Sequence, residues 1–131
     1  MRKKCLIPSF LILFLFGSSL VFASEKPSKT NAPVIPENVK TIINKSCFGC
    51  HNTDSKNEDA KEELDFKKLD GLSAMKKISA YKHIGEAVEE DEMPPKKFLE
   101  KRPEKKLSAE EKEIIITWAK KEAEALVKSK N

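Results

Sequence analysis

Two cysteines and a histidine stand close together in the pentapeptide Cys47-Phe48-Gly49-Cys50-His51. Two thiols separated by two residues can each form a thioether with one of the two vinyl groups of a single haem. The histidine that follows is then held beneath the ring, where its imidazole can coordinate the iron. This order of two anchors and one ligand predicts a covalent attachment site for one haem of the c type.

The same three residues are compatible with other chemistry. A thioredoxin-like redox pair needs alternating strands and helices, and the sequence shows no such alternation. A zinc site needs a fourth ligand, but the one other histidine is His83 and the third cysteine, Cys5, lies near the N-terminus. A structural disulfide across so short a spacing would be strained. We therefore favour haem, and these alternatives stay open.

The first 23 residues have the pattern of a secretion signal. The segment begins with three basic residues, an apolar run covers residues 6–16, and Val21-Phe22-Ala23 offers a cleavage site. We expect residues 1–23 to be a signal peptide and the protein to be periplasmic. The alternative is an uncleaved membrane anchor, for which the apolar run is barely long enough.

The rest of the chain divides into a linker and one small domain. Residues 24–36 contain three prolines and no periodicity, so we expect a flexible linker, followed by a c-type haem-binding domain at residues 37–131. Loss of the signal removes three of the 25 basic residues and none of the 21 acidic ones, so the net charge falls from +4 to +1. That charge argues against a nucleic-acid partner. Because the domain has one Trp and one Tyr, we expect a buried haem to complete a thin core.

Apolar spacing after the linker is helical throughout. It predicts an all-α fold with about three main helices around one covalent haem. These helices are expected at residues 37–46, at residues 72–90, and from Ser108, with Glu111 in a capping box, to about Val127.

Three segments between these helices are expected to be loops. Residues 52–63 are polar and predict a solvated loop with at most a turn of helix at its end. Leu64, Phe66 and Leu69 form an apolar patch that we expect to press on one face of the haem. Residues 96–106 predict a basic loop.

The second axial ligand of the iron is a choice among several side chains. Met93 stands before two prolines in a segment expected to be extended, from which a thioether can reach over the ring. His83 lies in the middle of an expected helix, and Met75 lies at a helix edge. A lysine, or no ligand at all, also stays open. We favour His51 and Met93 as the metal ligands.

These motifs together resemble the monohaem c-type cytochromes, and most closely the small periplasmic haem-binding domains of bacteria. The resemblance covers roughly residues 37–126. It rests on the pentapeptide at residues 47–51, Leu64-Asp65-Phe66, Glu92-Met93-Pro94-Pro95, and the segment from Leu107-Ser108 to Trp118. The resemblance implies a cytochrome c-like domain with one haem c carried by Cys47 and Cys50, His51 and Met93 as axial ligands, and electron transfer.

The function expected from this reading is that of a periplasmic electron carrier and not an enzyme. The alternative is a haem-based sensor or ligand-binding protein, in which the sixth ligand is displaceable. A peroxidase-like enzyme would need acid–base residues beside the iron, and only His83 is available. The expected partners are redox proteins with an acidic docking surface, which would meet the lysines that follow Met93. A membrane is expected as a partner only if the N-terminal segment is retained.

Overall fold

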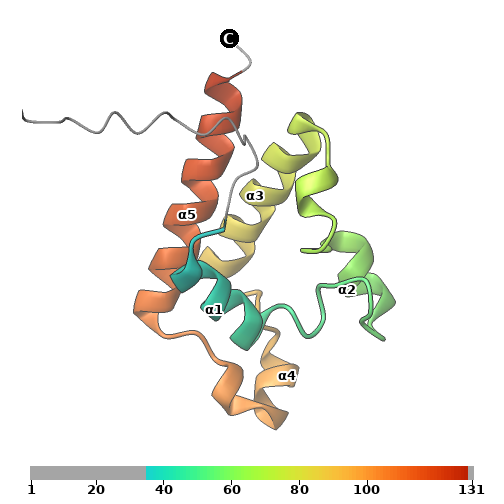
Figure 1. Cartoon of the computed structure of the whole chain (residues 1–131). Helices are drawn as coiled ribbons and strands as arrows, with labels where there is room; N and C mark the ends of the chain where they lie inside the picture. Colours follow the sequence, from blue (N-terminus) through green and yellow to red (C-terminus); the bar gives the residue numbers. More distant parts are fainter. Residues whose placement is uncertain (1–34, 130–131) are drawn as a thin grey trace, which may run out of the picture. The chain divides into compact units, whose positions relative to one another are not determined.

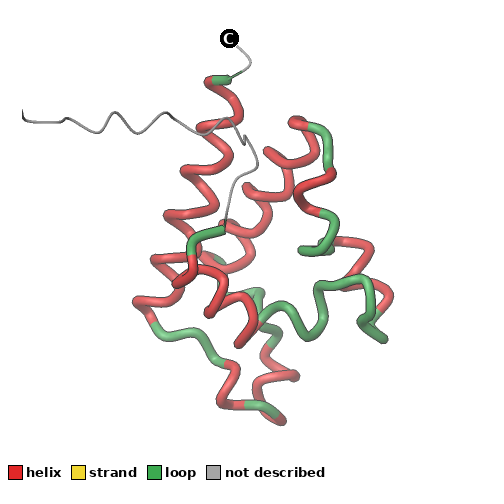
Figure 2. The backbone as a smooth tube through the Cα atoms, in the orientation of Figure 1, coloured by secondary structure: helices red, strands yellow, loops and turns green. Residues whose placement is uncertain are grey.

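The structure of the protein is a computed structural model that describes residues 35–129. The expected signal peptide and most of the expected linker lie outside the described residues. Helices and loops account for everything between residues 35 and 129, where the chain forms no strand (Figure 2). The predicted all-α fold is confirmed. None of the helices in this range is long and apolar enough to span a membrane.

Three long helices and two short ones make up the domain. They are α1 (Glu37–Ser46), α2 (Glu58–Glu63), α3 (Ala74–Glu89), α4 (Lys96–Lys101) and α5 (Ala109–Lys128), with 3₁₀ turns η1 (Leu69–Gly71) and η2 (Pro103–Lys105). Figure 1 shows α3 lying alongside α5. The predicted three main helices correspond to α1, α3 and α5.

The core lies between α3 and α5. Tyr81 is fully buried, and its ring meets the ring of Trp118 edge to face, with centroids 5.3 Å apart. One turn further along α3, Gly85 faces Ala119, and a Cβ built on Gly85 would lie 3.8 Å from the Ala119 Cβ. Small residues at this point let the two helices approach closely, and the aromatic pair fills the wider space beside them.

Helix α1 joins this pair through apolar contacts and one ion pair. Val39, Ile42 and Ile43 are buried in the same core cluster as α5. Lys45, at the end of α1, donates to both carboxylate oxygens of Glu111 at 2.8 and 2.7 Å. Because α1 leads directly into the cysteine pair, this contact helps to fix where the pentapeptide begins.

Glu111 also closes the first turn of α5. Its carboxylate accepts from the backbone N–H of Ser108 at 2.8 Å, and its own N–H donates to the Ser108 hydroxyl at 3.1 Å. This is the predicted capping box. The hydrogen bond from Lys45, followed by the one from the Ser108 backbone, lowers the pKa of Glu111.

Two details of the sequence interpretation are wrong. Residues 96–106 are not a loop but form α4 and η2, which begin directly after Pro95 and at Pro103. Proline suits the start of a helix because the missing N–H would be unpaired there anyway. Leu69 does not face the expected haem position, because it is completely buried in the core cluster with Tyr81.

Replacement of Glu111 by Gln should lower the free energy of unfolding at neutral pH by about 1 kcal/mol, because Gln can still cap α5 but cannot pair with the Lys45 ammonium. The folded-state pKa of Glu111 is lowered, so its contribution is complete above the ordinary carboxyl range and disappears as pH falls through the lowered pKa. Urea unfolding of the haem-loaded protein at several pH values measures this difference.

The matched control is Glu110→Gln, which removes the same charge from an exposed side chain in the same turn. A Glu111→Gln protein as stable as the Glu110→Gln protein at neutral pH would contradict the proposed role of the ion pair.

Candidate haem-binding site

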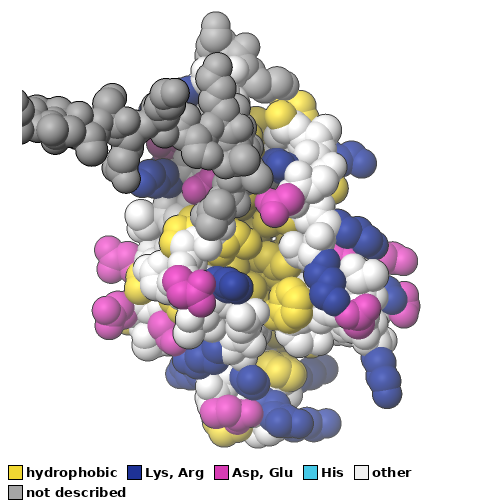
Figure 3. Space-filling view, viewed as in Figure 1, with side chains coloured by type: hydrophobic (Ala, Val, Ile, Leu, Met, Phe, Trp, Pro, Cys, Tyr) yellow, Lys and Arg dark blue, Asp and Glu magenta, His cyan; other side chains and the backbone are white. Residues whose placement is uncertain are grey.

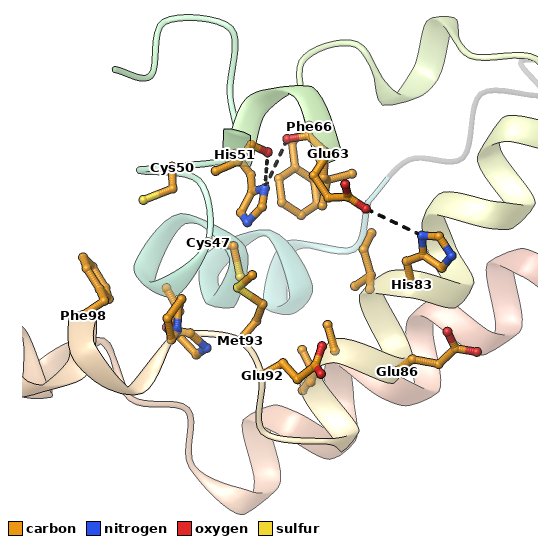
Figure 4. Close-up of a pocket in the computed structure, with 18 of the residues that line it drawn as sticks. Cys47, Cys50, His51, Glu63, Phe66, His83, Glu86, Glu92, Met93 and Phe98 are labelled. Carbon is orange, nitrogen blue, oxygen red and sulfur yellow. Dashed lines mark hydrogen bonds and ion pairs between the residues drawn. The ribbon is translucent and has the colours of Figure 1, made fainter. Parts of the chain in front are cut away.

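A cavity of about 520 Å³ is bordered by four parts of the chain. These are the end of α1, helix α3, helix α4 and the segment that follows α2. Its volume lies within the range of about 300–1,000 Å³ that is typical of cofactor and ligand sites. All four residues predicted for the site line it, namely Cys47, Cys50, His51 and Met93. Figure 4 shows them together with the neighbouring wall residues.

The cysteine pair occupies a tight turn that continues from α1. The N–H of Cys47 donates to Ile43 O at 2.8 Å, and the N–H groups of Cys50 and His51 both donate to Cys47 O at 3.1 Å. The two thiols are free and half-buried. Burial, with a smaller contribution from Cys50, raises the pKa of Cys47 to about 11, so this thiol is neutral at pH 7. Both side chains are therefore presented to one wall of the cavity as unpaired thiols.

His51 is oriented by the backbone of the segment that follows it. The side chain is buried, with 8% of the residue exposed, and Nδ1 lies 2.8 Å from Ala60 O and 3.2 Å from Leu64 O. A carbonyl oxygen can only accept, so Nδ1 carries the proton and Nε2 of the neutral ring keeps its lone pair. Figure 4 shows this second nitrogen on the side of the ring turned away from the carbonyls. An imidazole in this tautomer is suited to coordinate a metal.

Two further contacts hold the ring and its neighbours. The Phe66 ring and the imidazole form a T-shaped pair, with centroids 6.5 Å apart and an interplanar angle of 87°. The buried Asn52 side chain donates to Phe48 O and accepts from the N–H of Asp54 at 2.9 Å. The side chain of Asn52, the residue directly after the pentapeptide, thus connects the backbone of Phe48 with the backbone of Asp54.

Met93 is presented by a fixed turn after α3. The N–H groups of Glu92 and Met93 both donate to Ala87 O, at 2.9 and 3.0 Å. Asp91 adopts a left-handed conformation with φ 59° and pairs with Lys112 of α5. The half-buried thioether of Met93 therefore reaches the cavity from backbone that is tied to both α3 and α5.

The other ligand candidates are placed less well. Met75 is 63% exposed and is absent from the cavity lining. His83 lies at the cavity rim, where its largely exposed ring is 4.0 Å from a Glu63 carboxylate oxygen. Among residues 35–129, no group of three or more histidine, cysteine, aspartate or glutamate side chains is arranged to hold a metal ion.

The residues present fit a haem. The cavity brings together two free thiols, an imidazole with an available Nε2, and a thioether from a second segment. The larger apolar side chains of the remaining wall are Leu64, Phe66, Ile84, Val88 and Phe98, and acidic side chains, among them Glu63, Glu86 and Glu92, also border the cavity. A flat, largely apolar ring with an iron at its centre matches this combination of apolar walls, thiols and possible ligand atoms.

Sequence reasoning missed the groups that orient His51. The acceptors for Nδ1 are backbone carbonyls, and neither Asn52 nor Asp65 was assigned a structural role. Asn52 directly follows the pentapeptide, and a short polar side chain there is a recognisable turn signal. The carbonyls of Ala60 and Leu64 have no sequence signal, because every residue carries one.

Comparison with known protein families gives a match. A family described as a haem-binding domain matches residues 54–121, just over half of the chain. The chain belongs to this family and is a haem-binding protein. The matched region begins three residues after His51 and contains Met93. No curated protein and no solved structure matches the chain.

Proposed function

We propose that this haem-binding protein is an exported monohaem c-type cytochrome that carries electrons and is not an enzyme. The observation that carries the proposal is that Cys47, Cys50, His51 and Met93 line one cavity, although Met93 belongs to a segment 42 residues beyond His51. The signal-like pattern of residues 1–23 supports a periplasmic location.

Each of these residues has a distinct role in the proposal. Cys47 and Cys50 would hold one haem through thioether bonds, and His51 Nε2 and the Met93 sulfur would be the two protein ligands of its iron. When bound, the haem supplies one-electron exchange between ferric and ferrous iron. Two protein ligands leave no open position for a substrate, which favours electron transfer over catalysis. A thioether ligand stabilises the reduced iron and raises the potential.

Covalent attachment is tested by the mass of the denatured protein. After expression with a c-type maturation system and acid–organic extraction, the wild-type chain should retain the mass of one haem. Cys47→Ser and Cys50→Ser should each lose one thioether, and the double variant should release all colour. Cys5→Ser is the control, because that residue is expected to leave with the signal peptide. Complete extraction of haem from the wild type would contradict the proposal.

Replacement of Met93 by Ala should remove the weak long-wavelength sulfur-to-iron absorption band of the oxidised protein. It should also lower the reduction potential and let added imidazole bind, since the iron loses a ligand that favours its reduced form. Absorption spectra and redox titration measure both effects.

Met75→Ala and His83→Ala are the matched controls for that measurement and should keep the wild-type spectrum. If His83→Ala changed the spectrum while Met93→Ala did not, His83 would be the ligand. If wild-type iron bound imidazole as readily as the Met93→Ala protein, the site would be that of a ligand-binding protein.

A basic surface borders the proposed haem edge. We define the α4 basic surface by six residues of α4, η2 and the adjoining positions: Lys96, Lys97, Lys101, Arg102, Lys105 and Lys106. Most of these side chains are exposed, while Phe98 of the same helix lines the cavity. Figure 3 shows a group of Lys and Arg side chains over this part of the molecule. Such a surface is suited to steer an acidic redox partner toward the haem.

Reversal of two of these charges, Lys96→Glu with Lys97→Glu, should slow oxidation of the reduced protein by the anionic oxidant hexacyanoferrate(III) about tenfold at low salt. It should also flatten the dependence on ionic strength, because exposed charges are screened over about 10 Å at 0.1 M salt. Stopped-flow kinetics measure the rates. The control is Lys120→Glu with Lys121→Glu on α5. Equal rates for both double variants would remove any role of the α4 basic surface.

A further inference from the structure

We propose that Asp65, acting through Thr53, is a positioning residue that fixes the orientation of the His51 ring and thereby tunes the iron. This inference rests on the proposed coordination of haem iron by His51. It adds a specific carboxylate, outside the cavity lining, that controls one of the two ligands.

Asp65 is a buried acid with a complete set of partners. Its side chain is only 5% exposed. Oδ2 accepts from the Thr53 hydroxyl at 2.6 Å, and Oδ1 accepts from the N–H of Lys67 at 2.9 Å. The Lys68 ammonium lies 3.3 Å from Oδ2. Burial acts to raise the pKa of Asp65, but these hydrogen bonds outweigh it and lower the pKa, so the group is a carboxylate at neutral pH.

The two residues beside Asp65 both contact His51, and Ala60, whose carbonyl is the nearer acceptor for Nδ1 at 2.8 Å, lies in the segment between Thr53 and Asp65. Leu64 O accepts from His51 Nδ1 at 3.2 Å, and the Phe66 N–H donates to His51 O at 3.1 Å. Thr53 stands two residues after His51, so the Thr53–Asp65 hydrogen bond clasps together the two segments that make these contacts. Rotation of the imidazole would therefore require movement of the backbone segment that Asp65 holds in place.

Other links between the two segments are weaker. Asp54 and Lys67 form an ion pair across the same gap, but their side chains are 75% and 43% exposed. Exposed pairs of this kind contribute little to stability because water and salt screen them. A charge-assisted hydrogen bond to a buried carboxylate is considerably stronger. Thr53 is itself exposed, but its partner carboxylate is buried, so the Thr53–Asp65 bond is the stronger of these two side-chain links.

The hydrogen bond between Thr53 and Asp65, which we call the clasp, would affect the electron density that His51 gives to the iron. An imidazole whose Nδ1–H is firmly hydrogen-bonded is a more basic ligand, and it stabilises the ferric state. Loosening the clasp should weaken those bonds and make the ring a less basic ligand, so the reduction potential should shift to more positive values. It should also broaden the electron paramagnetic resonance signal of the low-spin ferric protein, because the ring would sample several orientations.

The experiment compares three haem-loaded variants with the wild type: Thr53→Val, Thr53→Ser and Asp65→Asn. Thr53→Val removes the hydroxyl at constant shape and charge, so a raised potential and a broadened signal there cannot come from a lost charge. Thr53→Ser retains the donor and should restore both properties. Asp70→Asn, which removes the same charge from an exposed residue, corrects the Asp65→Asn result for simple electrostatics.

The outcomes separate this inference from the proposed function. If the haem is covalent, and His51→Ala changes the spectrum, while Thr53→Val keeps the wild-type potential and signal, the clasp has no tuning role. The same holds if Asp65→Asn shifts the potential no more than Asp70→Asn does. If the wild type itself lacks covalent haem or His51 ligation, the proposed function fails first. An Asp65→Asn protein that does not fold leaves the decision to the Thr53→Val and Thr53→Ser pair.

Discussion

Helix α3 packs against α5 with one face and forms a wall of the cavity with the neighbouring face. Tyr81 and Gly85 meet α5, whereas Ile84 and Val88, close beside them on the helix surface, line the cavity. The carbonyl of Ala87 then anchors the backbone of the Met93 turn. The contact between α3 and α5 therefore sets both the width of the cavity and the position of its thioether. A change that separates the two helices would move the wall and the proposed ligand together.

Much of the fold could be predicted because its long helices are amphipathic. The residues that α3 buries, Ile78, Tyr81, Ile84 and Val88, have helical spacing in the sequence, and the Ser108–Glu111 capping box marks the start of α5. Helix α4 escaped prediction because six residues give no repeat of an apolar stripe, and its lysines alone indicate only a solvated segment. Leu69 was misplaced for a different reason. Its burial depends on the approach of α3 and α5, which no local pattern reports.

The candidate site could be predicted only where it is formed by side chains of a characteristic type and spacing. The thiols and His51 follow from the pentapeptide, and Met93 from its two prolines. The groups that orient these side chains are backbone atoms or distant partners, such as the Leu64 carbonyl and the Asp65 carboxylate, 12 residues from its partner Thr53. Such contacts depend on how a polar, aperiodic segment folds back on itself. Sequence spacing indicates the candidate ligands, and the tertiary structure determines how firmly their side chains are held in position.

The charged residues around Met93 are acidic before it and mainly basic after it. The acidic residues at the end of α3 oppose the helix dipole, which makes that end an unfavourable place for continued helix. Hydrogen bonding and charge from Lys112 lower the pKa of Asp91, with smaller contributions from Lys96 and Lys106, so the acidic turn is neutralised by basic groups on either side. Met93 lies at the boundary between this acidic end and the α4 basic surface. Two of the lysines that lower the pKa of Asp91, Lys96 and Lys106, also belong to the α4 basic surface, so in the proposed function these two charges would both stabilise the turn and contribute to the positive charge beside the haem edge.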